Sequence, residues 1–117
     1  MIKSDIPYMN YIIDIIKDIE DSMKDTSKNN FEKDKDKKDA NLRRIEIIIR
    51  SIKNISAELK NKYAHIEWEK FEKIEDMLKY KYFGVDFNAV WDFINEDIPK
   101  LKQEIEEIIN KEKQVNL

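Results

Sequence analysis

This chain of 117 residues contains one glycine, Gly84, and two prolines. Because glycine and proline mark turns and end regular elements, a chain so poor in both must form long, uninterrupted elements. Hydrophobic residues make up 41% of the chain and charged residues 40%. So many apolar residues argue against disorder, and the shortage of turn formers predicts one all-α domain over residues 1–117.

Apolar residues recur every three or four positions in four stretches, which is the pattern of one helix face. We expect helices over residues 5–24, 38–62, 67–82 and 87–112, with Ser4 or Asp5 capping the first. The side chains predicted to face the core are Tyr8, Ile12, Ile15, Ile16, Ile19 and Met23, then Leu42, Ile45, Ile48 or Ile49, Ile52, Ile55 and Leu59, then Trp68, Phe71, Ile74 and Leu78, and last Phe87, Val90, Trp91, Ile94, Ile98, Leu101, Ile105 and Ile108. Short connections between four such helices predict an antiparallel, up-and-down four-helix bundle.

Two features modify this simple bundle. Pro99 lies inside the last helical pattern, where it removes a hydrogen bond, so we expect a kink near Glu96 and Asp97 or a fifth helix. Ile47 and Ile49 widen the apolar face of the second helix. A helix with so wide a face packs on more than one neighbour, which suits a helix that serves both the core and a dimer interface.

Two segments lack the helical pattern. Residues 25–38 are polar except for Phe31, and we interpret them as a connector with at most a short helical turn anchored by that side chain. Acidic residues alternate with the lysines of this connector, so a solvated segment is favoured over a nucleic-acid contact. Residues 112–117 are expected to form a frayed tail.

Charge and residue types exclude several classes of function. The net charge is −3, which gives no overall field that would attract nucleic acid. There is no cysteine and only one histidine, His65, so we expect no metal site and no cofactor. Asp14 breaks the apolar run near the N-terminus, which is therefore too short and too charged for a signal peptide or a membrane span. A cytoplasmic protein without membrane contact is the expectation.

The stretch from Glu75 to Asp86 carries the most information about function. Gly84 is suited to ending one helix, and Asp86 to capping the next. The run 82–86, Tyr-Phe-Gly-Val-Asp, resembles the HepT-type members of the HEPN family. Other short segments on both sides of this run also match the family, and they occur in the same order along the chain. They are Asp39-Ala40, Arg43, Glu46-Ile47-Ile48, Ile66, Trp68, Val90-Trp91, Asp97, Pro99 and Leu101.

This resemblance implies a HEPN-like helical bundle that forms a homodimer and acts as the toxin of a toxin–antitoxin pair. In active HepT-type proteins an Arg and a His from two subunits meet at the dimer interface and cleave RNA without a metal. The implied partner is an MntA-type minimal nucleotidyltransferase antitoxin, which attaches AMP to a tyrosine that matches Tyr82 of this chain.

The chain departs from the family at the two catalytic positions. Glu75 stands at the Arg position, Asp76 follows it, and Tyr80 stands at the His position. A tyrosine, with an ordinary pKa of about 10, is almost wholly protonated at neutral pH and is a poor general base. A carboxylate in place of Arg puts an anion where the phosphate must lie. Both changes predict lost or reduced RNase activity.

Three interpretations of these positions stay open. In the first, Glu75 pairs with Lys79 four residues on, Asp76 can bond Tyr80, and with Lys81 they form a polar patch at the dimer interface. In the second, Tyr80, Tyr82, Lys79 and Lys81 form a rearranged active site. In the third, Glu75 and Asp76 hold a metal, which is the weakest because neighbours on a helix point about 100° apart.

Three functions are considered for the chain. The first is a HepT-like homodimer of the toxin type that pairs with a nucleotidyltransferase and has lost or reduced RNase activity. The second is an active RNase toxin with a non-standard site. The third is a substrate- or nucleotide-binding subunit of a nucleotidyltransferase, with its ligand in the cleft beside the third helix.

Overall fold

The computed structural model describes residues 2–79 and 85–115, and only the backbone at residues 75, 77–79 and 115. The described residues form helices, in the order η1 (Ile2–Asp5), α1 (Ile6–Met23), α2 (Lys28–Lys33), α3 (Lys35–Lys53), α4 (Ala57–Lys62), α5 (Trp68–Lys79), α6 (Phe87–Asp92), the π-helical turn η2 (Phe93–Asp97) and α7 (Ile98–Val115). The prediction of an all-α bundle is confirmed.

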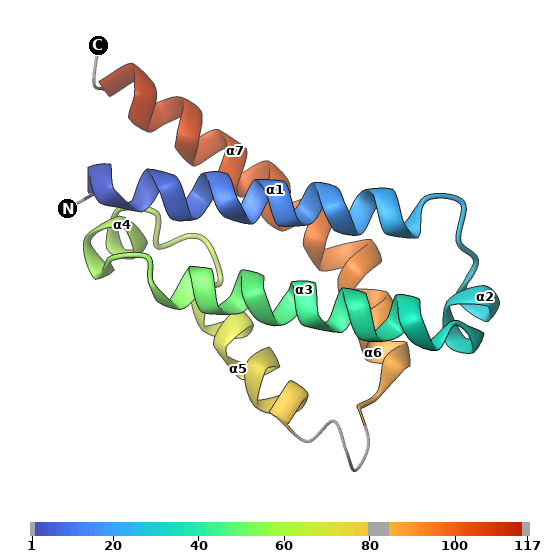
Figure 1. The fold of residues 1–117 in the computed structure, drawn as a ribbon. Helices are drawn as coiled ribbons and strands as arrows, with labels where there is room; N and C mark the ends of the chain where they lie inside the picture. The colour runs from blue at the N-terminus through green and yellow to red at the C-terminus, as the bar shows by residue number, and fades with distance from the viewer. Residues whose placement is uncertain (1, 80–84, 116–117) are drawn as a thin grey trace.

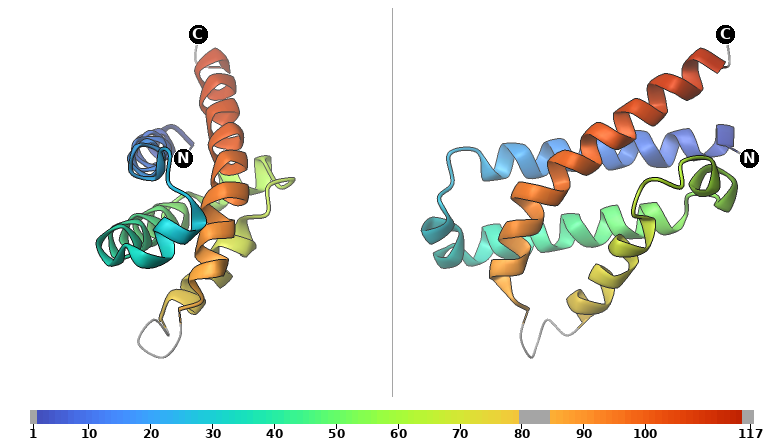
Figure 2. Two further views of the ribbon diagram at one scale, coloured as in Figure 1. Left: turned by 90° about the vertical axis from the view of Figure 1, so that its right-hand side faces the viewer. Right: turned by 180° about the vertical axis from the view of Figure 1, so that it is seen from behind.

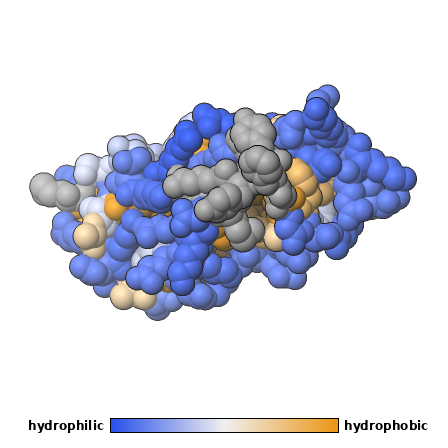
Figure 3. Space-filling model, turned by 90° about the horizontal axis from the view of Figure 1, so that it is seen from below, coloured by the Kyte–Doolittle hydropathy of each residue, from blue (hydrophilic) through white to orange (hydrophobic). Residues whose placement is uncertain are grey.

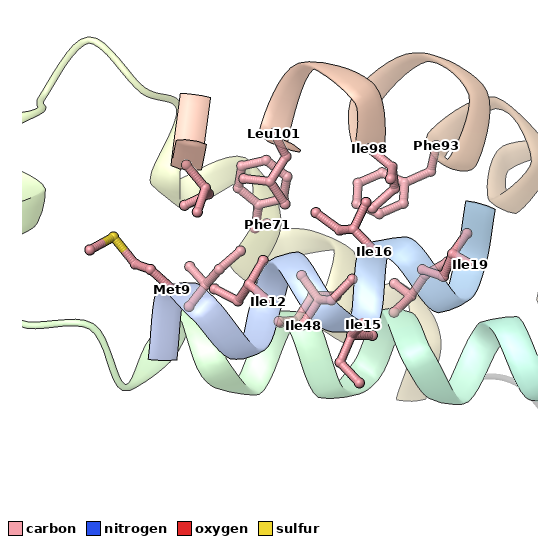
Figure 4. Close-up of a cluster of buried hydrophobic side chains, with 14 of the residues drawn as sticks. Met9, Ile12, Ile15, Ile16, Ile19, Ile48, Phe71, Phe93, Ile98 and Leu101 are labelled. Carbon is pink, nitrogen blue, oxygen red and sulfur yellow. The ribbon is translucent and has the colours of Figure 1, made fainter. Parts of the chain in front are cut away.

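The helices lie in two layers. Helices α1 and α3 run antiparallel side by side in one layer, and α5, α6 and α7 cross behind them in the other (Figures 1 and 2). Isoleucines dominate the contact between the layers, because α1 and α3 turn their three- and four-residue apolar rows toward α5 and α7. Figure 4 shows this core, where Ile12, Ile16 and Ile48 lie close to Phe71 and Leu101.

The segment predicted as one helix over residues 38–62 is two helices. Helix α3 ends at Lys53, and Asn54 donates its backbone N–H back to Arg50 O. Ser56 then caps α4 by accepting from the N–H of Leu59 at 3.2 Å. An extended Ser56 cannot belong to a continuous helix, so the chain turns here.

The predicted apolar rows need one correction. Tyr8 was expected in the core, but its side chain lies on the outside of α1 and is 41% exposed. On α3, Ile48 and Ile49 are both fully buried, and Ile47 is partly buried against the core. The apolar face of α3 is therefore wide, as the sequence pattern predicts.

The segment expected to be a polar connector carries more helix than its composition suggests. Helix α2 forms around Phe31, which is fully buried and packs on Trp91 with ring centroids 5.6 Å apart. Helix α3 begins at Lys35, because the carboxylate of Asp34 accepts from the N–H of Lys37 at 3.0 Å. Local capping therefore starts a helix that apolar periodicity alone does not reveal.

The expected irregularity before Pro99 is present. The helical run continues from α6 into α7 through η2, where the N–H of Ile98 donates to Phe93 O, five residues back. A π turn adds one residue to the helix, and here it precedes a proline that has no N–H to offer. Helix α7 then continues to Val115, so residues 112–115 of the predicted tail are helical.

Candidate functional site

The residues predicted to matter for function are divided between the end of α5 and the connection from α5 to α6. Helix α5 ends at Lys79 and α6 begins at Phe87. Tyr80, Lys81 and Tyr82 lie outside the described residues, so their predicted roles stay predictions. Glu75 and Lys79 belong to α5, and their side chains are likewise outside what the structure describes. The side chain of Asp76 is exposed.

Two local interactions fix the ends of the helices that flank this connection. The indole N–H of Trp68 donates to Tyr63 O at 3.1 Å and positions the start of α5. Asp86 accepts from the N–H groups of Asn88 at 2.9 Å and Ala89 at 3.3 Å, which confirms the predicted cap of α6. The end of α5 and the start of α6 thus lie on the same side of the molecule, below α3 in the view of Figure 1.

A small cavity lies beside this connection, between α3, α5 and α6. Its volume is about 240 Å³, and its walls are mainly apolar, with Ile45, Ile74 and Phe93 among them. Asp92 and Asp97 contribute the charged part of the lining. The volume is below the range of about 300–1,000 Å³ usual for small-molecule sites, and the carboxylates would repel a phosphate.

A wider groove runs between α4 and α5 and is the cleft beside the predicted third helix. Its volume is about 870 Å³, and its lining includes Trp68, Lys60 and Lys73 together with Glu67, Glu69 and Glu72. The basic residues are matched by acidic ones, and Lys60 lies 4.0 Å from Glu72. A groove of balanced charge has no general preference for an anionic ligand.

Three exposed carboxylates flank the α5–α6 connection among the described side chains. Asp76, Asp86 and Asp92 are exposed on the two helices that flank it. Asp97 differs from these three carboxylates because it accepts a hydrogen bond from the Lys70 ammonium at 2.6 Å. This hydrogen bond raises the pKa of Lys70 above its ordinary value, although burial opposes the shift. The surface on this side of the molecule is mostly hydrophilic, with small apolar areas beside the connection (Figure 3).

No group of three or more His, Cys, Asp or Glu side chains suited to a metal occurs within residues 2–79 and 85–115. The single histidine, His65, is exposed and lies edge-on to Tyr63, with ring centroids 6.3 Å apart. No helix among the described residues is long and apolar enough to cross a membrane.

Sequence reasoning missed a buried polar cluster at the end of α7. Glu112 is only 4% exposed and accepts from the Lys62 ammonium at 2.8 Å and from the Tyr63 hydroxyl. These hydrogen bonds lower the pKa of Glu112, and burial together with the same carboxylate raises the pKa of Tyr63 to about 12. The sequence does carry one indication that Glu112 faces inward. Its spacing continues the row formed by Ile105 and Ile108 on α7.

A second buried carboxylate was predicted in a different role. Asp5 was expected to cap α1, but it makes no side-chain cap there. It is 2% exposed, and its two oxygens accept from the N–H of Ser56 at 2.8 Å and the hydroxyl of Ser56 at 2.6 Å. The residue therefore ties the N-terminus to the turn between α3 and α4. Neither buried cluster touches the α5–α6 connection.

The described residues define an all-α helical bundle, and the residues predicted to matter for function begin on α5. The chain belongs to the HepT-like ribonuclease family, whose model matches residues 12–108. The recognition of a HepT-like HEPN domain is thereby confirmed.

Several curated proteins are similar to this chain. A protein of Methanocaldococcus jannaschii named "Gamma-glutamylcyclotransferase and putative RNase MJ0434" is 44% identical over 89% of this chain, which spans only 47% of that relative's length. A Caldanaerobacter subterraneus protein named "Putative RNase TTE0752" is 32% identical over 95% of this chain and 99% of its own. The "Probable ribonuclease HepT" of Thermococcus cleftensis is 33% identical over 92% of this chain and 98% of its own. No solved structure matches the chain.

Proposed function

We propose that this chain is a HepT-like homodimer of the toxin type that pairs with an MntA-type nucleotidyltransferase and has lost or reduced RNase activity. The family match supports the scaffold, and the resemblance of the sequence to HepT-type proteins implies the partner. The observation that carries the loss of activity is the residue types at the catalytic positions, Glu75 and Tyr80. The exposed carboxylates of Asp76 and Asp86 support it, because they add anions where RNA phosphates must approach.

The chemistry follows from what RNA cleavage needs. Attack of a 2′-hydroxyl requires a group that exchanges a proton near neutral pH, and a cation that stabilises the charge developing on the phosphate. Tyr80 does not meet the first need at its ordinary pKa, and Glu75 opposes the second. A two-fold dimer with its site at the interface would contain each unfavourable residue twice.

The partner is tested by co-expressing the chain with the nucleotidyltransferase encoded beside it. We expect the two to co-purify and AMP to be transferred to Tyr82, which intact-mass measurement and peptide mapping would detect. Tyr82→Phe should abolish the modification, and Tyr8→Phe serves as the matched control because Tyr8 is an exposed tyrosine on α1. No transferase gene beside this one, or no complex, would count against the pairing.

An active RNase with a non-standard site is the second candidate, because the relatives bear RNase names. Expression in a bacterial host distinguishes the two. Our proposal predicts normal growth. Growth arrest that disappears in Tyr80→Phe or Tyr82→Phe, with folding unchanged by circular dichroism, would favour the active enzyme instead.

A further inference from the structure

A groove lies between α1 and α7, two helices that contact each other and cross at an angle (Figure 2). We call it the α1–α7 groove, and its volume is about 600 Å³. It shares no lining residue with the cavity or the groove beside α5. Its lining consists of Asn10, Ile13, Asp14 and Lys17 from α1, and of Lys102, Glu106, Ile109 and Asn110 from α7.

The two helices present the same four kinds of side chain to the groove, in matching order. They run in opposite directions, since the start of α1 and the end of α7 lie at the same end of the molecule (Figure 1). The Lys102 ammonium donates to Glu20 at 3.0 Å and sets their alignment. Because each residue advances a helix by about 1.5 Å, positions opposite each other follow from this contact. Asn10 lies at about the level of Asn110, Ile13 of Ile109, Asp14 of Glu106 and Lys17 of Lys102.

The floor of the groove is apolar. Ile109 is buried, and Ile13 is partly buried against the core. Both side chains are β-branched and belong to long helices, so their rotamers are restricted and the floor has a fixed shape. An aliphatic chain that lies across this floor is removed from water, which stabilises it there.

Two carboxylates without a cation lie beside this floor. Asp14 and Glu106 are exposed, and among the described residues neither makes an ion pair or a side-chain hydrogen bond. Lys102 does not neutralise them, because its ammonium is bonded to both carboxylate oxygens of Glu20, at 3.0 and 3.1 Å. Lys17 is the one other charge in the lining, so two carboxylates face a single cation. A cation placed between Asp14 and Glu106 is attracted by both.

Two carboxamides lie at the next level along the groove. Asn10 and Asn110 are exposed, and within the described part of the chain their side chains make no hydrogen bond. Asn95, by contrast, donates its amide to a carbonyl of its own helix, Trp91 O. A carboxamide offers both a donor and an acceptor, and these are the groups that the main chain of an extended segment requires.

We propose that the α1–α7 groove binds an extended segment of a partner protein through one arginine. The guanidinium lies between Asp14 and Glu106, the aliphatic part of the arginine covers the two isoleucines, and the main chain beside it bonds the two asparagines. Arginine suits this position because its planar fork of donors serves two carboxylates at once, while its stem is apolar. Each kind of side chain at the middle of the groove thereby has a partner.

An arginine-containing segment explains this lining better than two other occupants do. A nucleic acid would bring phosphates beside Asp14 and Glu106, and these carboxylates repel them. A polyamine supplies a cation and an aliphatic chain, but it leaves the carbonyl oxygen and amide of each asparagine without the paired donor and acceptor that a peptide main chain offers.

The groove is formed by α1 and α7 alone, so this binding does not depend on the residues at positions 75 and 80. It holds whether or not the chain cleaves RNA and whether or not a nucleotidyltransferase modifies Tyr82. The experiment therefore measures binding of peptides to the groove and requires no enzymatic activity.

The experiment selects peptides from a random library displayed on phage, with the immobilised full chain as the target. Enriched peptides are synthesised with a fluorescent label, and fluorescence anisotropy gives their dissociation constants. The carboxylate variant carries Asp14→Asn and Glu106→Gln. The matched control carries Asp18→Asn and Glu107→Gln, which remove the same charges from exposed positions of α1 and α7 outside the groove lining. Circular dichroism checks that each variant folds.

We expect the enriched peptides to carry an arginine beside apolar residues, and to bind the natural chain and the control equally well. The carboxylate variant should bind them at least about tenfold more weakly, because charge-assisted hydrogen bonds are lost. Citrulline in place of the arginine of the peptide, which keeps its shape without its charge, should cause a similar loss. Asn10→Ala with Asn110→Ala should weaken binding but keep the preference for arginine over citrulline.

Several results would overturn the proposal. They include enrichment of no peptide, enrichment of peptides that lack arginine, and a carboxylate variant that binds the peptides as tightly as the control does. Spermidine that binds the natural chain as tightly as the peptides, and loses affinity in the carboxylate variant, would assign the groove to small cations instead. A lower mass of the carboxylate variant in sedimentation, with the control unchanged, would assign it to a second copy of the chain.

Discussion

At the scale of single residues, two buried carboxylates hold segments together that are far apart in the sequence. Asp5 joins the N-terminus to Ser56, which in turn caps α4. Glu112 joins the end of α7 to Lys62 and to Tyr63. A buried carboxylate is stable only where donors satisfy it, so each of these contacts is a requirement of the fold.

Replacing Asp5 by Ala should lower the free energy of unfolding by about 2 kcal/mol, because Ser56 loses its acceptor and the cap of α4 loses its support. Urea unfolding measures the effect. Ser56→Ala should destabilise as well, and the double variant should lose less than the two single losses combined, since both break one contact. Asp14→Ala, at an exposed position, is the control and should be nearly neutral. Full additivity of Asp5→Ala and Ser56→Ala would contradict the coupling.

Glu112 makes stability depend on pH. Its pKa is lowered in the folded chain by the hydrogen bonds from Lys62 and Tyr63. Its contribution is therefore complete above the unfolded carboxyl pKa of about 4.3 and is lost as the pH falls below it. Glu112→Gln should cost about 1.5–3 kcal/mol at pH 7, and the difference from the natural chain should shrink toward low pH.

Urea unfolding of the natural chain and of Glu112→Gln at pH 7, 5 and 3.5 measures this difference. The titration of the other carboxylates affects both proteins equally and cancels in the difference. Glu107→Gln, on the exposed side of α7, should follow the natural chain at every pH. A gap between Glu112→Gln and the natural chain that is constant with pH would contradict a charged Glu112 in the folded state.

At the scale of elements, periodicity predicted the long helices well and their ends poorly. The three- and four-residue rows located α1, α3, α5 and α7, because burial of an apolar face stabilises a helix wherever its partner lies. The break at Ser56 was missed, because its cause is a contact with Asp5 that is distant in sequence. The extension of α7 beyond residue 112 to Val115 was missed as well.

One aromatic side chain, Phe31, packs the polar segment around α2 against the core. Phe31 lies edge-on to Phe87 with ring centroids 6.5 Å apart, and also packs against Trp91. Phe31→Ala should cost about 3–5 kcal/mol, since it leaves a cavity beneath α2. Thermal and urea unfolding measure the loss, and Glu32→Ala on the exposed side of α2 is the control. A loss below about 1 kcal/mol would mean that α2 does not anchor the connector.

At the scale of the whole molecule, the fold class and the family follow from sequence, but the candidate site follows only in part. Asp86 caps α6 as predicted, while Tyr80, Lys81 and Tyr82 lie outside the described residues, so their predicted roles stay predictions. The outer positions of Tyr8 and Tyr11 were not predicted, because a periodic pattern does not tell which side of a helix another layer covers. The exposure of these two tyrosines is therefore a feature that only the three-dimensional arrangement reveals.

The proposed loss of RNase activity rests on the residue types at positions 75 and 80, and mutation can exchange them. Glu75→Arg with Tyr80→His places in this chain the two side chains that its active relatives are expected to use. Arg supplies a cation for the phosphate, and His a pKa near neutrality. The exchange tests whether the rest of the scaffold still supports the reaction.

The most direct measurement is cleavage of a labelled RNA by the purified natural chain and by the Glu75→Arg, Tyr80→His variant, each with and without a metal chelator. We expect no cleavage by the natural chain under either condition, and chelator-resistant cleavage by the variant, provided that both proteins are folded. Chelator-resistant cleavage by the natural chain at a rate equal to or above that of the variant would contradict a loss of activity at these positions.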